Sequence, residues 1–140
     1  MAEDELAAFL RERLDELETA ALAAARSAGG LFWGADAAGD VVLEPMQEPG
    51  MAAAGEADEI APLVAELDDA GWHVALQSPA RVLAGIEAKR GLIDQCLMWQ
   101  REAAQGGRGA VVAIVAENVL SLLALPWADH EDYQPVWRLS

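Results

Sequence analysis

Two histidines and one cysteine are the residues of this chain whose chemistry could support catalysis. His73, Cys96 and His130 lie far apart in the sequence, so a nucleophile and its base would have to be brought together by the fold. Without such a partner, a histidine beside Trp72 is a structural residue and a cysteine on an apolar helix is a small buried hydrophobe. The sequence therefore predicts no catalytic residue and leaves these three as candidates.

The segment Asp129-His130-Glu131-Asp132 is the densest group of possible metal ligands. One imidazole and several carboxylates can bind a divalent cation, which makes Asp129, His130 and Asp132 the candidates. Adjacent residues in a turn seldom converge on one ion, however, and a single histidine forms no recognisable ligand spacing. We therefore expect a capped turn, or salt bridges from this segment to a helix, and we predict no metal or other cofactor.

Charged residues on two predicted helices form the other candidate site. The candidate binding residues are Arg81, Lys89, Arg90, Glu12, Asp15 and Glu16. The three cations are expected to pair with carboxylates of the first helix within the molecule. The alternative is that they form a pocket for an anion or a phosphopeptide.

The negative charge of the chain is concentrated in its first half. Residues 1–75 contain 17 Asp and Glu against three Arg (net −14), whereas residues 76–140 contain seven against six cations (net −1). Such a surface repels phosphate backbones and anionic lipid headgroups, which argues against nucleic-acid or membrane binding. It suits a basic partner protein, or mimicry of nucleic acid toward a DNA-binding protein. The same acidity would also keep a hydrophobic protein in solution without any partner.

The start of the chain predicts a long amphipathic helix. Leucine and alanine recur at spacings of three and four from Leu6 to Ala24, which indicates a helix over residues 3–26. Carboxylates in its first turn and Arg26 in its last turn agree with the helix dipole. Gly29-Gly30 supplies the stop.

The central part of the chain predicts further helices. Ser78-Pro79 is typical of a helix start and indicates a helix that continues to about Gln105. The apolar spacing before it favours a shorter helix over residues 57–70, which Gly71 should end or kink. Residues 72–77 are expected to form a helical turn.

Between these helices, short apolar runs predict a β-hairpin. Leu31-Phe32-Trp33 and Val41-Val42-Leu43 flank a turn-rich segment. An isolated hairpin is marginal in water, so we expect it to pack on a helix through Phe32 or Trp33. The segment from Glu44 to Gly55 contains proline and glycine without a usable period and predicts a loop.

The C-terminal part predicts an apolar helix and an aromatic tail. Ala110–Leu125 is apolar almost all round and should be a core helix or the contact of a homodimer. Polar residues such as Glu117 interrupt it, so no apolar run reaches the ~18 residues that a bilayer requires, and a cytoplasmic protein is predicted. A single cysteine, Cys96, fits a reducing compartment. Large aromatics alternate with polar residues from Trp127 to Trp137, which predicts an extended strap across the helices.

Several segments together resemble one known family. They are Phe9–Glu16 (FLRERLDE), Arg81–Asp94 (RVLAGIEAKRGLID), Leu122–Tyr133 (LLALPWADHEDY) and the terminal Trp137-Arg138. In these segments, at both ends and in the centre, the chain is similar to small actinobacterial and actinophage proteins known only as a domain of unknown function. The resemblance implies an accessory or phage-related setting and brings no activity with it.

Two histidines of that family are missing from this chain. The family commonly has His-Asp-Pro at the start of the central helix and a further His after the Ile-Asp. This sequence has Gln77-Ser78-Pro79 and Gln95-Cys96 at those places. If the family's histidines carry metal or acid–base chemistry, this chain has lost part of it.

Together these patterns predict an α+β, mainly α-helical protein. We expect three to four packed helices, a small β-hairpin and an extended aromatic C-terminal tail in a single domain over residues 1–140. The lack of a convincing catalytic set favours a non-catalytic interaction protein whose acidic half binds a basic partner protein. A small metal- or histidine-dependent hydrolase and a nucleic-acid mimic are the alternatives, and the sequence leaves open whether the protein is an enzyme.

Overall fold

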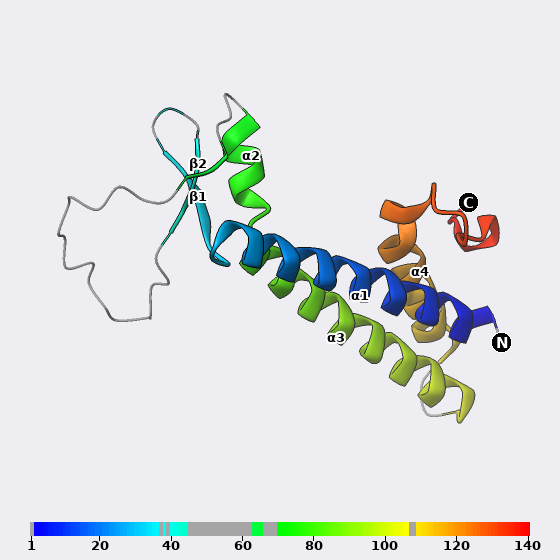
Figure 1. The fold of residues 1–140 in the computed structure, drawn as a ribbon. Coiled ribbons are helices and arrows are strands. Elements are labelled where there is room, and N and C mark those ends of the chain that lie inside the picture. The colour runs from blue at the N-terminus through cyan, green and yellow to red at the C-terminus, as the bar shows by residue number, and fades with distance from the viewer. Residues whose placement is uncertain (1, 37, 39, 45–62, 66–69, 107–108) are drawn as a thin grey trace, which may run out of the picture. The chain divides into compact units, whose positions relative to one another are not determined.

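The computed structural model describes residues 2–36, 38, 40–44, 63–65, 70–106 and 109–140. These residues form a mainly helical α+β structure with four α-helices and a three-stranded antiparallel sheet (Figure 1), which confirms the predicted fold class. The chain divides into two compact units. We name Met1–Leu17 with Gly85–Ser140 the helical unit, and Glu18–Ala84 the sheet unit. The single domain expected from the sequence stays a prediction.

Helix α1, Ala2–Ala28, confirms the first predicted helix. Its apolar stripe is buried as the spacing indicates, with Leu10 and Leu14 each only 1% exposed. Gly29 ends the helix in the left-handed region at φ 87°, and the N–H groups of Gly29 and Gly30 both donate to the carbonyl of Ala25 at 2.9 Å. This capping satisfies a carbonyl that the helix leaves without a partner.

Helix α3, Pro79–Ala104, confirms the predicted central helix. In the helical unit it contributes buried Ile86, Ile93 and Cys96 to the core. Within that unit the first half of α1 and the second half of α3 run antiparallel, side by side (Figure 1). Their apolar stripes supply the adjoining core residues.

Two ion pairs align α1 and α3 in the helical unit. Arg11 Nη2 lies 2.9 Å from Asp94 Oδ1, and Arg90 Nη2 lies 2.6 Å from Asp15 Oδ1. A step of four residues forward along α1 is therefore matched by a step of four residues back along α3. Since each helix contributes one cation and one anion, a shift by one turn would set like charges opposite each other, and the pairs favour this alignment.

Helix α4, Ala110–Ala124, forms where the apolar helix was predicted but is buried on one face only. Its buried residues are Ala116, Leu120, Ser121 and Ala124. Of the two expectations for this segment, a core helix is not what the described residues form, because only one row of mainly small residues is buried, and the homodimer contact stays a prediction. The opposite row, which includes Val111 at 72% exposure, is left at the surface.

The expectation that no segment is long and apolar enough to cross a membrane is also corrected. Ala110–Trp127 spans 18 residues with a mean hydropathy of 1.9, and 22% of it is buried. The reason is that the polar residues around Glu117 are too few to lower the average over the whole segment. By length and composition alone this segment qualifies, and the cytoplasmic location stays a prediction.

The C-terminal tail packs on the helical unit as a succession of tight turns. The 3₁₀ helices η1, Leu125–Trp127, and η2, Pro135–Trp137, are connected by turns in which His130 N–H donates to the Trp127 carbonyl at 2.9 Å. Trp137 is 7% exposed. The tail is therefore anchored by an aromatic residue, as expected, although its backbone is more turned than an extended strap.

The sheet unit confirms the predicted hairpin and adds a third strand. Strand β1, Trp33–Ala35, pairs antiparallel with β2, Val41–Leu43, and β2 pairs antiparallel with β3, Leu63–Ala65. The carboxylate of Asp36 closes the hairpin turn by accepting from the N–H groups of Ala38 and Asp40 at 3.0 and 2.9 Å. This is the turn chemistry for which aspartate is favoured.

Two helix predictions in this unit require correction. Leu63–Ala65 is strand β3 where a helix over residues 57–70 was predicted, and Gly71 lies at the start of α2, Ala70–Leu76, rather than at a helix end. The apolar spacing was too short to distinguish a helix from a strand, and pairing with β2 decided the outcome. The expected helical turn over residues 72–77 is confirmed by α2. The rest of the predicted helix and the predicted loop after Glu44 lie outside the described residues.

Candidate functional site

The three residues predicted as possible catalysts lie in different parts of the fold. His73 is exposed on α2 in the sheet unit, whereas Cys96 lies on α3 and His130 lies in the tail of the helical unit. In the part of the chain that the structure describes, no three His, Cys, Asp or Glu side chains are grouped as metal ligands would be. That statement covers the predicted metal candidates, which are Asp129, His130 and Asp132.

Cys96 is a core residue of the helical unit. Its side chain is 1% exposed, and burial raises the pKa of its thiol. A thiol with a raised pKa stays protonated at neutral pH and is a poor nucleophile. His130, the histidine of the same unit, is bonded to Arg13 and Asp132 instead. Cys96 therefore has the properties of the small buried hydrophobe that its helix position predicts.

Arg13 is the buried polar residue to which the tail is attached, and no sequence pattern singled it out. Its side chain is 6% exposed, and its Nη1 contacts both ring nitrogens of His130, donating to Nδ1 at 3.0 Å. The backbone N–H of Asp132 donates to the same Nδ1 at 3.1 Å. Nδ1 of His130 is thus the acceptor of hydrogen bonds from within the chain, which hold the imidazole against Arg13.

Aromatic rings surround this arginine–histidine contact. The guanidinium carbon of Arg13 lies 5.2 Å from the ring centroid of Phe9, one turn earlier on α1. The Phe9 centroid lies 5.6 Å from that of His130, 6.2 Å from that of Tyr133 and 5.1 Å from that of Trp137. Contacts of these kinds contribute about 0.5–1.5 kcal/mol each beyond the buried area. Phe9 on α1 therefore contacts all three of these tail residues and attaches the tail to the helix.

Three carboxylates lie around the buried guanidinium. Oxygen atoms of Glu12, Glu16 and Asp132 lie 3.4, 2.9 and 3.8 Å from its nitrogens. The three acidic side chains are 70%, 63% and 66% exposed, so one positive charge lies beneath three negative charges at the surface. The local sum of −3 and +1 leaves a net charge of −2.

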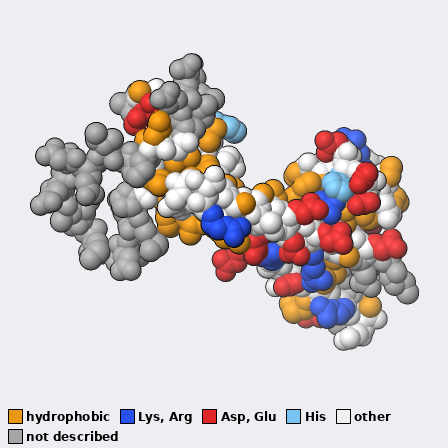
Figure 2. Space-filling view, viewed as in Figure 1, with side chains coloured by type: hydrophobic (Ala, Val, Ile, Leu, Met, Phe, Trp, Pro, Cys, Tyr) orange, Lys and Arg blue, Asp and Glu red, His pale blue; other side chains and the backbone are white. Residues whose placement is uncertain are grey.

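We define the acidic patch as these three carboxylates together with their exposed neighbours Asp129 and Glu131. Asp and Glu side chains gather over the face of the helical unit seen in Figure 2. The patch joins α1 to the tail, two segments that are far apart in the sequence. It therefore includes carboxylates of the C-terminal part, which the charge count by halves did not indicate.

The predicted intramolecular pairing of the central-helix cations is confirmed for Arg90, which pairs with Asp15. Arg81 is exposed at the start of α3, and Lys89 is half-buried further along. Two of the predicted binding carboxylates, Glu12 and Glu16, pair with Arg13 rather than with the central helix. The anion pocket among Arg81, Lys89 and Arg90 stays a prediction.

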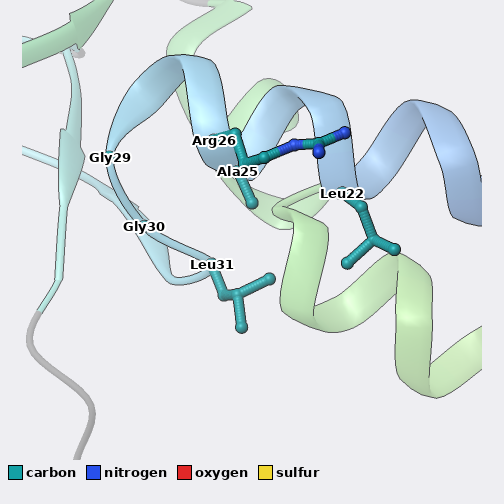
Figure 3. A pocket seen from close by; sticks show the side chains of 6 residues that line it. All are labelled: Leu22, Ala25, Arg26, Gly29, Gly30 and Leu31. Atoms are coloured by element: carbon teal, nitrogen blue, oxygen red, sulfur yellow. The ribbon is translucent and has the colours of Figure 1, made fainter.

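An open apolar groove of about 520 Å³ lies in the sheet unit, where α1 ends (Figure 3). Its lining residues are Leu22, Ala25, Arg26, Gly29, Gly30 and Leu31. The turn at Gly29 reverses the chain, so that Leu22 and Leu31 face the same opening, with Arg26 as the one charged lining residue. The groove offers apolar contact area and contains no nucleophile or acid–base pair among these lining residues.

No curated protein and no solved structure matches the chain. The sequence model of one family, a family of unknown function designated DUF6221, matches residues 3–139. This match confirms the resemblance to a domain of unknown function and extends it over both units. It supplies a family without an activity.

Proposed function

The chain belongs to this family of unknown function, DUF6221. From the geometry of its acidic patch, we propose that it is a non-catalytic interaction protein that binds a basic partner protein. The observation that carries the proposal is the arrangement of charge around Arg13. The only cation within the cluster is buried, while its three carboxylates remain largely exposed.

This arrangement fixes the positions of acidic side chains while the cluster keeps a net negative charge at the surface. Carboxylates on a surface are usually mobile, and fixing them on binding costs conformational entropy. Here Arg13 positions Glu16 by an ion pair at 2.9 Å and lies beneath Asp132 and Glu12. A partner that brings lysine or arginine side chains would meet acceptors that are already oriented, and complementary charge would speed its association.

The state of the candidate catalytic groups also supports an interaction protein. The acceptor nitrogen of His130, Nδ1, is bonded within the chain, and Cys96 is buried with a raised thiol pKa. Neither side chain therefore has the exposure and the partner that a nucleophile or general base requires.

A charge-matched pair of variants tests the acidic patch. The patch variant carries Glu12→Gln, Glu16→Gln and Asp132→Asn. The control carries Asp40→Asn, Glu44→Gln and Glu87→Gln, and both variants have a net charge of −12 in place of −15. Each protein is immobilised and exposed at low salt to an extract of the cells from which it comes, and the retained proteins are quantified by mass spectrometry.

We expect the wild type and the control to retain the same basic protein, and the patch variant to lose it by about tenfold or more, since several charged contacts would be removed. Equal retention by the two variants would show that net charge alone, and not this patch, attracts the partner, which would contradict the proposal.

We further propose that the exposed row of α4 joins two copies of the chain. The apolar residues of this row are Val111, Ile114, Val115 and Leu122, each at least 45% exposed, and Leu125 at the start of η1 extends it at 39%. Asn118 is exposed in the same stretch and could pair with its counterpart across a two-fold axis. A self-contact through α4, whose only charged residue is Glu117, would keep the acidic patch of each copy accessible.

Sedimentation equilibrium over a range of concentrations tests this second proposal. The wild type should show a concentration-dependent dimer, which Leu122→Lys disrupts and the exposed control Glu87→Lys does not. A monomer at every concentration would contradict it, and so would co-sedimentation with neutral lipid vesicles in place of self-association.

A further inference from the structure

The open apolar groove at the end of α1 lies in the sheet unit, apart from the acidic patch (Figure 3). Its volume of about 520 Å³ is in the range of sites that bind small molecules. The large apolar side chains of its lining are Leu22 and Leu31, which are 41% and 37% exposed. The small residues Ala25, Gly29 and Gly30 complete the apolar lining. Two leucines therefore face solvent at one opening, where an apolar group can cover both.

The charge around this groove differs from that of the rest of the acidic half of the chain. Residues 1–18 contain seven Asp and Glu, whereas from Thr19 to Ala35 the sequence contains none, and Arg26 is the only charged residue of that segment. The Arg26 side chain is exposed. None of the ion pairs among the described residues involves it. The groove is therefore a place where this acidic protein favours an anion.

Arg26 lies close enough to the apolar lining to act on the same occupant. Leu22 and Arg26 are four residues apart on α1, so their side chains are neighbours on the helix surface. Figure 3 shows the Arg26 side chain extending along α1 toward Leu22. The planar guanidinium matches the geometry of a carboxylate. An occupant that combines an apolar group with one carboxylate therefore meets both features.

The backbone of the lining turn is largely bonded within the chain. The N–H groups of Gly29 and Gly30 both donate to the Ala25 carbonyl. The Gly30 carbonyl accepts from Trp33 Nε1 at 3.1 Å, and the Leu31 carbonyl accepts from a backbone N–H of α3 at 2.9 Å. A peptide would bring amide groups for which these positions offer no partner, and unpaired amide groups weaken binding. An acyl chain has no such groups.

We propose that this groove binds a medium-chain carboxylate, an unbranched acyl chain with one terminal carboxylate. The chain lies against Leu22 and Leu31, and the carboxylate pairs with the Arg26 guanidinium beside them. The inference does not depend on the basic partner protein, because the groove and the acidic patch belong to different units of the fold.

Amide and indole resonances in the ¹H–¹⁵N spectrum of the full-length protein provide the test. Octanoate is titrated as the probe, below the concentration at which it forms micelles. The reporters are the backbone N–H groups of Gly29 and Gly30 and the indole N–H of Trp33, which donates to the Gly30 carbonyl. The indole of Trp137, in the helical unit, is the internal reference. We expect saturable shifts of the three reporters and none for Trp137.

The carboxylate is tested with 1-heptanol, which keeps the seven apolar carbons of octanoate and lacks its charge. Octanoate should bind about two- to fivefold more tightly, the factor that an exposed ion pair contributes. Arg26→Gln should remove this preference. The matched control is Arg138→Gln, an exposed arginine of the helical unit, which should keep it.

The apolar lining is tested with Leu22→Gln, which keeps the side-chain length and makes it polar. It should weaken octanoate binding by about threefold or more, because apolar contact area is lost. The matched control is Leu92→Gln on α3, where the leucine is 45% exposed, and it should leave the titration unchanged. Should a variant fail to fold, the comparison of octanoate with 1-heptanol on the wild type decides the question alone.

Three results would overturn the inference. One is the absence of saturable shifts at Gly29, Gly30 and Trp33. Another is equal or tighter binding of 1-heptanol by the wild type, which excludes a carboxylate site. The third is tighter binding of a short peptide with a C-terminal leucine than of octanoate, which would assign the groove to a peptide.

Discussion

In the helical unit, side chains from distant parts of the sequence hold the elements together, whereas in the sheet unit the backbone does so. The ring of Phe9 contacts three other rings, and Arg13 contacts His130 and three carboxylates. In the sheet unit the strands have three residues each, and backbone bonds such as Ala80 N–H to the Leu31 carbonyl, at 2.9 Å, connect the segments.

This difference predicts which kinds of substitution destabilise each unit. The helical unit should respond to the identity of a few buried side chains and tolerate changes at its helical glycines. The sheet unit should tolerate side-chain truncation and respond to changes that restrict its backbone. The proposed binding of a basic partner lies with the helical unit, whose side-chain network positions the acidic patch.

The two phenylalanines of the chain give the largest expected contrast. Phe9 is buried in the helical unit at 5% exposure, and Phe32 is 36% exposed in the sheet unit. Phe9→Ala should lower the free energy of unfolding by about 3–5 kcal/mol, because it removes the central ring of the cluster and leaves a cavity. Phe32→Ala should cost about 1 kcal/mol or less. Urea unfolding monitored by tryptophan fluorescence measures both, and equal effects would contradict the comparison.

Two arginines on the same helix provide the next contrast. Arg13→Ala should lower the free energy of unfolding by about 2–3 kcal/mol, since it removes a buried hydrocarbon stem and the contact with His130. Arg11→Ala removes an exposed ion pair with Asp94 and should change it by at most about 0.5 kcal/mol. Thermal melts of the two variants make the measurement. A larger loss of stability for Arg11→Ala than for Arg13→Ala would show that Arg13 is not the residue that attaches the tail.

Glycine substitutions should have opposite signs in the two units. Gly29 has a φ of 87°, so Gly29→Ala should cost about 1–2 kcal/mol in the sheet unit. Gly91 lies within α3 with no atom within 4 Å of an added Cβ, so Gly91→Ala should stabilise the helical unit by about 0.5–1 kcal/mol. Denaturant midpoints of the two variants make the comparison, and a loss of stability in both would break it.

The smallest effect is expected from the exposed ion pair between α1 and α3. A double-mutant cycle of Asp15→Asn and Arg90→Gln should give a coupling energy of about 0.3–1 kcal/mol that decreases with added salt. The pair favours one alignment of α1 against α3 but contributes little to the free energy of unfolding. A coupling much larger than this, and independent of salt, would show that the contact is shielded from solvent.

The sequence predicted the long helices because their signals are local. Apolar spacing and the Ser78-Pro79 start are read over neighbouring residues, and α1 and α3 have the expected bounds within a few positions. Strand β3 could not be predicted in this way. Its few apolar residues fit either period, and its partner β2 lies some twenty residues away in the sequence.

The candidate site was predicted only in part, because it depends on contacts between distant segments. His130 and Asp132 were singled out, with salt bridges to a helix as the expected role, and both contact Arg13. Arg13 itself was overlooked, although its place four residues after Phe9 was the available signal. Nothing local distinguishes an arginine that is buried by a tail more than a hundred residues later from one that is exposed.

Zero-length cross-linking tests the central claim, the binding of a basic partner at the acidic patch, most directly. A carbodiimide joins carboxylates to lysines, and Lys89 is the only lysine of this chain, so cross-links within the molecule are few. In an extract of the cells from which the protein comes, the wild type should cross-link to lysines of one basic protein mainly at Glu12, Glu16 and Asp132. Cross-links spread over the exposed carboxylates of both units in proportion to their exposure would contradict the account.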